Sequence, residues 1–327
     1  MPFLKRRNSI AVLIFAILVI SVIIYGFMNK SQDSTLPNVN KNISLQDDFT
    51  GAKIEKEDLI RGCFGKDCIP SIDNPKFDNA SNALWLNDAD IVFAVNYKSV
   101  QRAYPQRILN WHEIVNDEIN GEAVIITFCP LCGSAVGFKR TVNEINTEFG
   151  VSGFLHDNDL VMYDRLEGNL WQQITGEAIV GPAARRNEIL EQIPVITSTW
   201  SEWKKEFPNT EVLSTDTGFS RDYDLYPYGT YEKDDTLLFG VKELNKALQI
   251  KTVVYGIELN GESKAYPEET LKSKRKVKDN LGGSEIEINY KDSGEVEVID
   301  SSGNKIIPIR LFWFAWAAFH PDTLLYE

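Results

Sequence analysis

Two stretches of the chain, residues 91–128 and 253–290, align with each other without a gap. Each contains the tripeptide Ala-Tyr-Pro, at residues 103–105 and 265–267, after two short runs of β-branched and aromatic residues. A helix-like stretch, a glycine turn and another strand-like run follow in both copies. Self-similarity of this kind indicates repeated structural units. The sequence therefore predicts two related strand–strand–helix–strand units, at about 91–139 and 253–300, within one body.

The segment between the copies, about residues 143–248, continues with short apolar bursts separated by Gly, Asn, Asp and Pro. This pattern predicts many short strands joined by hairpins. A short helix is expected around residues 201–207, with Ser198 or Thr199 as its N-cap. The apolar run 311–326 is too short for a membrane span and is expected to be buried. The predicted fold class is α+β, predominantly antiparallel β, with an internal duplication.

One N-terminal transmembrane helix is predicted at residues 10–28, which are almost uninterruptedly apolar and long enough to cross a bilayer. The basic cluster Lys5-Arg6-Arg7 precedes this segment, so the positive-inside rule places residues 1–9 in the cytoplasm. A cleaved signal peptide is the alternative, but no A-x-A-like site ends the segment. The polar residues 29–48 are expected to be a linker to an extracytoplasmic domain, residues 49–327, at the cell surface or in the periplasm.

The chain combines 34 basic with 47 acidic side chains, which gives a formal net charge of −13. An acidic surface repels nucleic acid and anionic lipid headgroups. We therefore expect no nucleic-acid partner, and membrane contact only through the N-terminal helix; a protein partner is not specified. The sequence also contains no Ser–His–Asp signature, P-loop, dinucleotide fingerprint or H-E-x-x-H motif, so it does not decide whether the protein is an enzyme.

The sharpest local motif is Cys129-Pro130-Leu131-Cys132-Gly133, which lies between two strand-like runs. A strand, C-P-x-C-G, strand pattern is typical of a metal knuckle, in which a tight turn brings two thiolates to one side. Such a site needs further ligands, and the sequence contains no second C-x-x-C. A short disulfide between the same two cysteines, either structural or redox-active, is the alternative.

The third and fourth ligands are sought among the three histidines of the chain. His112 lies on the apolar face of the first helix-like stretch, which is expected to pack on the strand that leads to Cys129. His320, in the aromatic C-terminal run, is a candidate fourth ligand, whereas His156 has the surroundings of a solvated loop residue. A histidine that faces the core is also commonly a hydrogen-bonded structural residue, and this alternative stays open.

The second copy of the repeat serves as an internal comparison. Lys274 takes the place of His112, and Lys291 and Gly294 take the places of the two cysteines. Packing alone would favour apolar replacements, not lysine. The difference indicates that the first copy holds a site and that the second is scaffold.

Cys63 and Cys68 are separated by four residues and are expected to form a small disulfide loop in an oxidising compartment. The alternative places them opposite the knuckle as the missing ligand pair. Soft thiolate sites favour Cu(I) or Zn(II), so copper or zinc is the expected cofactor. The segment Arg221-Asp222-Tyr223 opens an aromatic loop and is a further candidate, as ligands or as a surface contact.

The chain also resembles the family catalogued as domain of unknown function 3179, over roughly residues 60–327. The resemblance implies an exported bacterial or archaeal protein without an established activity. It makes His112, Cys129, Cys132 and His320 motif positions, and does not include the Cys63/Cys68 pair as a general feature. The motifs that carry it are Trp85-Leu86, Ala103-Tyr104-Pro105, Asn110–Asp117, Phe128–Gly133, Asp159–Asp164, Arg221-Asp222-Tyr223, Trp313–Trp316 and Phe319-His320-Pro321.

The leading hypothesis is a membrane-anchored extracytoplasmic protein that binds copper or zinc through Cys129, Cys132, His112 and His320. The first alternative is a thiol–disulfide oxidoreductase that uses the same cysteines. The second is a non-catalytic cell-surface binding module that presents the aromatic loop 223–231.

Overall fold

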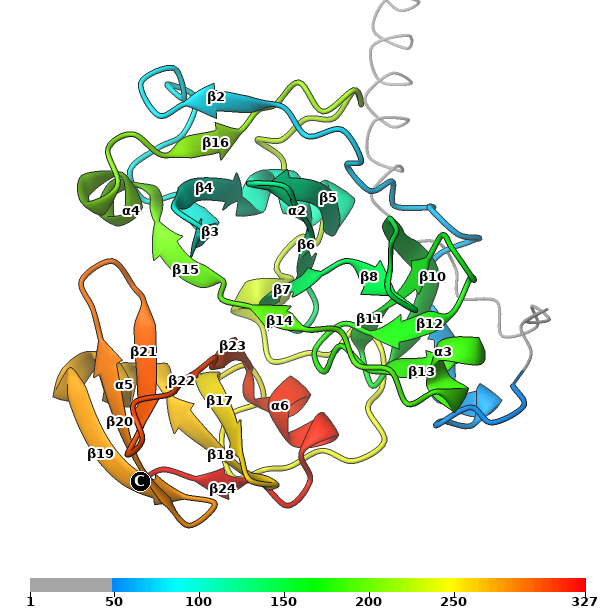
Figure 1. Ribbon diagram of the computed structural model, residues 1–327, viewed down its shortest axis with the longest axis vertical. Coiled ribbons are helices and arrows are strands. Elements are labelled where there is room, and N and C mark those ends of the chain that lie inside the picture. The colour runs from blue at the N-terminus through cyan, green and yellow to red at the C-terminus, as the bar shows by residue number, and fades with distance from the viewer. Residues whose placement is uncertain (1–48) are drawn as a thin grey trace, which may run out of the picture. The chain divides into compact units, whose positions relative to one another are not determined.

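The computed structural model describes residues 49–327, so the expected transmembrane segment 10–28 and linker 29–48 lie outside the described residues. The described chain folds into small, mostly antiparallel β-sheets with few and short helices (Figure 1). The predominance of antiparallel strands predicted from the sequence is thereby confirmed. Within the described residues, no helix is long and apolar enough to cross a membrane.

The two repeat units have the same order of elements. The first contains β3 (Ile91–Tyr97), β4 (Val100–Pro105), α2 (Gln106–His112), β5 (Ile114–Ile119), β6 (Glu122–Cys129) and β7 (Ser134–Lys139). The second contains β17 (Val253–Leu259), β18 (Glu262–Pro267), α5 (Glu268–Lys274), β19 (Lys276–Leu281), β20 (Ser284–Tyr290) and β21 (Val296–Asp300). In both units the first two strands pair as an antiparallel hairpin and the last three form a second antiparallel sheet.

The helix of each unit is shorter than the helix-like stretch in the sequence. In the first unit, α2 ends at His112 because Glu113 adopts a left-handed conformation, with φ of 58°, and its N–H donates to Leu109 O. Residues 114–119 then continue as strand β5, since β-branched side chains favour a strand that pairs with β6. The left-handed residue recurs in the second unit at Arg275, with φ of 61°.

The similarity between the two halves extends beyond the segments that align in sequence. The first half continues with β14 (Gln192–Ile193), β15 (Ile196–Thr199), α4 (Trp200–Glu206) and β16 (Glu211–Leu213), and the second with β22 (Lys305–Ile306), β23 (Ile309–Phe312), α6 (Trp313–Phe319) and β24 (Leu324–Leu325). Strands β15 and β23 pair antiparallel with the first strand of their units, and β16 and β24 pair parallel with the second. Thr199 caps α4 as expected, because its side chain accepts from Glu202 N.

One hydrogen bond braces the end of each half in the same way. The indole Nε1 of Trp203 donates to Thr210 Oγ1 at 2.9 Å, and that of Trp316 donates to Thr323 Oγ1 at 2.7 Å. Both indoles are buried, with exposed fractions of 0% and 1%. Each bond ties the helix that contains the tryptophan to the start of the strand that pairs in parallel, β16 or β24.

Thr210→Val is expected to lower the free energy of unfolding by about 1–3 kcal/mol, because a buried indole N–H then has no partner. Thr323→Val is expected to lower the free energy of unfolding by less, since Thr323 is only half-buried and water can replace its hydroxyl. Urea unfolding of both variants tests this, with the unmodified chain as reference. Equal costs for the two substitutions would contradict the assignment.

The first half contains an additional sheet between β7 and β14, formed by residues 140–191 and hereafter called the insert. Its strands were expected from the sequence and are β10 (Phe149–His156), β11 (Asp159–Asp164), β12 (Leu170–Gln172) and β13 (Ala178–Val180), with α3 (Pro182–Arg185) following. The small pair β8 (Thr141–Val142) and β9 (Ile145–Asn146) leads into it. The remaining elements are η1 (Lys56–Asp58), β1 (Leu59–Arg61) at the edge of β10, β2 (Phe77–Asn79) beside β16, and η2 (Tyr231–Lys233).

The largest hydrophobic cluster lies where the insert, the first unit and the C-terminal helix meet. It includes Trp171 of β12, Trp313 and Trp316 of α6, and both Cys129 and Cys132. The C-terminal aromatic run is thus buried, as its composition predicts. The two cysteines therefore lie in the core and not on the surface.

Candidate functional site

The cysteine motif forms a tight turn between β6 and β7. Cys132 N donates to Cys129 O at 3.2 Å, and Gly133 adopts a left-handed conformation with φ of 62°. A Cβ atom at Gly133 would lie 2.9 Å from the ring of Phe312, so only glycine fits there. Both thiols are free within the described part of the chain, and their residues are 2% and 0% exposed.

A carboxylate from the insert completes a cluster with the two thiols. Asp159, at the start of β11, has a carboxylate oxygen that lies with Cys129 Sγ and Cys132 Sγ in a group within 4.8 Å of one another. We call these three residues the Cys–Asp cluster. Asp159 Oδ2 accepts from Gln172 Nε2 at 2.5 Å and from Ile174 N at 3.1 Å. Its other oxygen, Oδ1, is buried and has no hydrogen-bond partner among residues 49–327 apart from the two thiols, which interact with this carboxyl.

The surroundings of the cluster disfavour negative charge. Burial raises the pKa of both thiols, and the nearby carboxyl of Asp159 adds to this effect. Burial also raises the pKa of Asp159 to about 6 and that of Glu113 to about 7. Without a cation, the thiols are protonated at neutral pH. A bound cation would offset the desolvation of all these groups.

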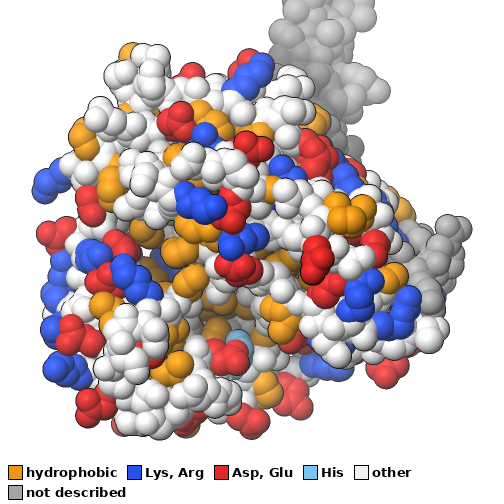
Figure 2. Space-filling model, in the orientation of Figure 1, with side chains coloured by type: hydrophobic (Ala, Val, Ile, Leu, Met, Phe, Trp, Pro, Cys, Tyr) orange, Lys and Arg blue, Asp and Glu red, His pale blue; other side chains and the backbone are white. Residues whose placement is uncertain are grey.

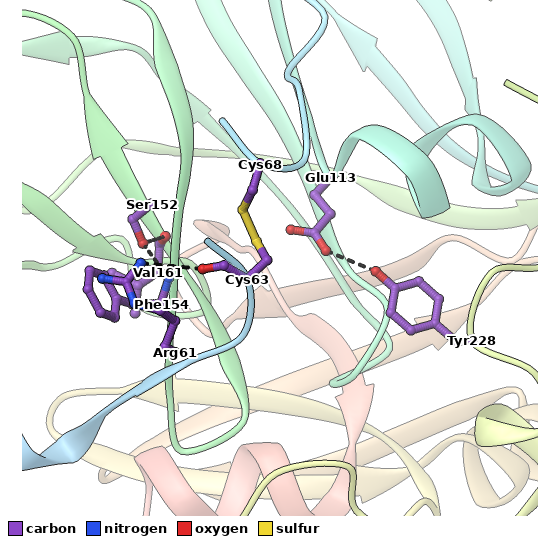
Figure 3. The surroundings of a disulfide bond; sticks show 8 residues. All are labelled: Arg61, Cys63, Cys68, Glu113, Ser152, Phe154, Val161 and Tyr228. Atoms are coloured by element: carbon purple, nitrogen blue, oxygen red, sulfur yellow. Dashed lines mark hydrogen bonds between the residues drawn. A yellow bond between two sulfur atoms is a disulfide. The ribbon is translucent and has the colours of Figure 1, made fainter. Parts of the chain in front are cut away.

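Glu113 approaches the cluster from the left-handed position after α2. Its carboxylate accepts a hydrogen bond from Tyr228 Oη at 3.1 Å, which Figure 3 shows near the disulfide of Cys63 and Cys68. Glu113 is 7% exposed, and its charge raises the pKa of Cys129. The second half has an exposed arginine at the equivalent position, so this buried acid is specific to the first half.

A loop after β16 covers the cluster with another tyrosine. Tyr231 Oη donates to Leu131 O at 2.9 Å, within the cysteine turn, and accepts from Asn158 Nδ2 at 3.2 Å. Asn158 O in turn lies 3.4 Å from Cys132 Sγ. The hydroxyl of Tyr231 thus connects the cysteine turn to the hairpin that carries Asp159.

The disulfide expected between Cys63 and Cys68 is present. Its loop packs on β10, where Cys63 N donates to Gly153 O at 3.2 Å. As a disulfide the pair offers no thiolate, so it does not provide the missing ligands that the sequence left as an alternative.

His112 lies outside the Cys–Asp cluster, and both of its ring nitrogens are engaged. Nδ1 donates to Pro70 O at 2.7 Å, which leaves Nε2 to accept from Tyr223 Oη at 2.7 Å. Burial lowers the pKa of His112, which favours this neutral tautomer. The structure therefore gives this histidine the hydrogen-bonded environment of a structural residue.

His320 is also outside the cluster. It stacks on Trp316 with ring centroids 3.8 Å apart, as Phe207 packs on Trp203 at 4.3 Å in the first half. Burial lowers the pKa of His320 to about 4. The His320 ring therefore occupies the packing position that the Phe207 ring occupies in the first half.

The segment 221–223 lies against α2. The Tyr223 hydroxyl bonds to His112 and to Thr217 Oγ1 at 2.6 Å, and the Arg221 guanidinium lies 5.9 Å from the Trp111 ring. Arg221 and Asp222 are exposed. Tyr223 acts in this structure as the partner of His112, which sequence reasoning did not connect with it.

His156 is not the solvated loop residue that its surroundings in the sequence suggest. Its side chain is 12% exposed, and Nδ1 donates to Gln172 Oε1 at 2.7 Å. Because Gln172 Nε2 donates to Asp159, the bond from His156 fixes the orientation of that amide. His156, Gln172 and Asp159 thus form a series of hydrogen bonds that ends at the Cys–Asp cluster.

Of the four ligands predicted from the sequence, the structure brings together Cys129 and Cys132, and adds Asp159 to them. Asp159 was not among the ligands predicted from the sequence. Among the described residues it has no ion pair. Its position at the start of the motif Asp159–Asp164 was the available signal.

The fold and the cluster define a class: an antiparallel β protein with an internal repeat and a buried dithiol–carboxylate group. The chain belongs to the family described as "Protein of unknown function (DUF3179)", whose profile matches residues 66–323. The resemblance seen in the sequence is thereby confirmed. Among curated proteins and solved structures, none matches the chain.

Proposed function

We propose that this protein binds a metal ion, Zn(II), through Cys129, Cys132 and Asp159. The observation that carries the proposal is the buried group of two free thiols and the Asp159 carboxylate, whose Oδ1 has no hydrogen-bond partner in the described chain other than these thiols. A buried carboxylate is costly unless strong partners compensate for its desolvation. A metal ion would engage this oxygen and both sulfurs at once.

The donor set favours zinc over copper. Zn(II) accepts both thiolate and carboxylate ligands in a tetrahedral arrangement, whereas Cu(I) selects soft sulfur ligands. Three protein ligands leave a fourth position, and Glu113 is the next carboxyl that acts on Cys129 and Asp159. A bound ion also deprotonates a coordinated thiol, which offsets the effect of burial on the thiol pKa.

The same electrostatics disfavour the oxidoreductase alternative. A reactive C-x-x-C pair needs a lowered thiol pKa, commonly at a helix N-terminus. Here the pair lies in a turn between two strands, and burial raises the pKa of both thiols. Buried, protonated thiols attack disulfides slowly.

We also propose an extracytoplasmic location with a membrane anchor at residues 10–28. The disulfide of Cys63 and Cys68 supports an oxidising compartment, where such bonds persist. The surface supports the exclusion of nucleic acid, because acidic and basic side chains are interspersed over the face in Figure 2 and the net charge is −13.

The test is metal content and free thiols, measured together on the full chain purified without oxygen. We expect one zinc ion per chain, and replacement by Co(II) should produce sulfur-to-cobalt charge-transfer absorption. A chain without metal whose Cys129 and Cys132 cycle between dithiol and disulfide would favour the oxidoreductase. A chain with neither property would favour a non-catalytic binding module.

A further inference from the structure

A second site, separate from the metal cluster, lies beside α2. A polar pocket of about 160 Å³ opens between this helix and the loop that contains Tyr223 and Glu232. We propose that this pocket binds an organic ammonium ion, the protonated amine of a small molecule. The proposal does not depend on the metal site.

One buried acceptor that lines the pocket is unsatisfied. Asn110 is 7% exposed, and its Oδ1 has no hydrogen-bond partner in the part of the chain that the structure describes. Tyr226, whose hydroxyl interacts with the Glu232 carboxylate, lines the same pocket. Buried polar groups are nearly always hydrogen-bonded in native proteins, so the unsatisfied oxygen of Asn110 points to a ligand. The acceptor Asn110 Oδ1 requires a donor, which an ammonium N–H supplies.

The charge of the pocket selects a cation. Three carboxylates, those of Asp90, Asp224 and Glu232, line it together with a single cationic side chain, Arg107. Arg107 donates to Asp90 at 2.7 Å and to Asp224 at 2.6 Å, so it neutralises only part of their charge. The remaining negative charge attracts a positive ligand.

A metal ion does not fit this pocket. Within the described residues, the Cys–Asp cluster is the one group of three or more acid, thiol or imidazole ligands close enough to share an ion. The three carboxylates of the pocket therefore do not converge on one metal position. An ammonium group needs only single hydrogen bonds, and an aromatic residue, Tyr226, is among the residues that line the pocket.

At the equivalent place in the second half, the side chains that would line such a pocket differ. The positions that match Arg107 and Asn110 are Glu269 and Lys272. Lys272 pairs with Glu268 at 3.1 Å and with Glu269 at 3.2 Å, so its charge is compensated within the helix. The framework thus folds without an unsatisfied amide here, and Asn110 is not needed to build the unit.

Saturation-transfer NMR on the full chain tests the proposal, with propylammonium as probe and propan-1-ol as its neutral equivalent. We expect transfer to propylammonium at millimolar concentration and none to the alcohol. Asp224→Asn and Glu232→Gln should each weaken binding about two- to fivefold. Asp222→Asn, a neighbouring exposed carboxylate that does not line the pocket, is the matched control and should change nothing. Absence of transfer, equal transfer to the alcohol, or equal effects of Asp222→Asn and Asp224→Asn would overturn the proposal.

Asn110→Leu separates a ligand contact from a structural role. Leucine has a similar size and lacks the unsatisfied oxygen, so the variant should lose propylammonium binding while its melting temperature stays the same or rises. Its zinc content should not change, which distinguishes this site from the metal cluster. Retained binding of propylammonium in this variant would refute the assignment.

Discussion

Cys132→Ser is expected to lower zinc affinity by about 100-fold or more. Changes to groups that only orient metal ligands already cost about 10- to 100-fold. Loss of the ligand itself removes a metal–sulfur bond and leaves a hydroxyl with a much higher pKa. Competition with a chromophoric chelator, on the full chain kept reduced, measures the effect.

The matched control for this experiment is the double variant Cys63→Ser/Cys68→Ser. It removes two sulfur atoms that form the disulfide and are outside the Cys–Asp cluster. Its zinc affinity should equal that of the unmodified chain. If zinc affinity fell equally in both variants, the loss would reflect general unfolding. That result would refute the Cys–Asp cluster as the zinc site.

Asp159→Asn is expected to have two opposite effects: loss of tight zinc binding and a more stable metal-free protein. In the folded state, burial raises the pKa of Asp159 from the usual 3.8 to about 6. The folded protein therefore binds the proton more tightly than the unfolded chain. Its stability falls as pH rises from about 4 through 6, by about 3 kcal/mol in total. Asparagine has no charge to desolvate, and its carbonyl can still accept from Gln172 and Ile174.

Urea unfolding of the metal-free protein at pH 4 and pH 8 provides the measurement. The variant should gain about 3 kcal/mol over the unmodified chain at pH 8 and little at pH 4. Glu113, whose pKa burial raises to about 7, contributes a fall of the same sign in both proteins, and this fall is smaller in the variant because the charge of Asp159 no longer raises the Glu113 pKa. An identical pH dependence in both proteins would show that Asp159 is not a desolvated acid.

The sequence revealed only part of the duplication. Residues 91–128 and 253–290 align at a constant offset, but the insert in the first half changes that offset for everything after it. The common pattern that remains is Trp-x-x-Trp with a later Pro-x-Thr, at residues 200–210 and 313–323. A search that allowed one long gap would have found it, and would have aligned His320 with Phe207.

Of the candidate site, only the two cysteines could be predicted from the sequence. The C-P-x-C-G spacing predicts a turn from local geometry, and the structure contains that turn. Asp159 reaches the thiols only because the insert packs on the first unit, and no periodicity encodes such a long-range contact. One acid among 47 acidic side chains cannot be selected on residue type. His112 was selected on residue type and helix face, and the partners that occupy its nitrogens, Pro70 and Tyr223, are distant in sequence.

Because of the position of the insert, the proposed ion would change how easily part of the protein opens. Cys129 and Cys132 belong to the duplicated framework, whereas Asp159 belongs to a hairpin of the insert. A single ion would therefore cross-link two parts of the chain that are otherwise joined by hydrogen bonds, side-chain packing and peptide connections. With the ion in place the hairpin would open only together with the framework. Without it, local opening of the hairpin would require less free energy than global melting.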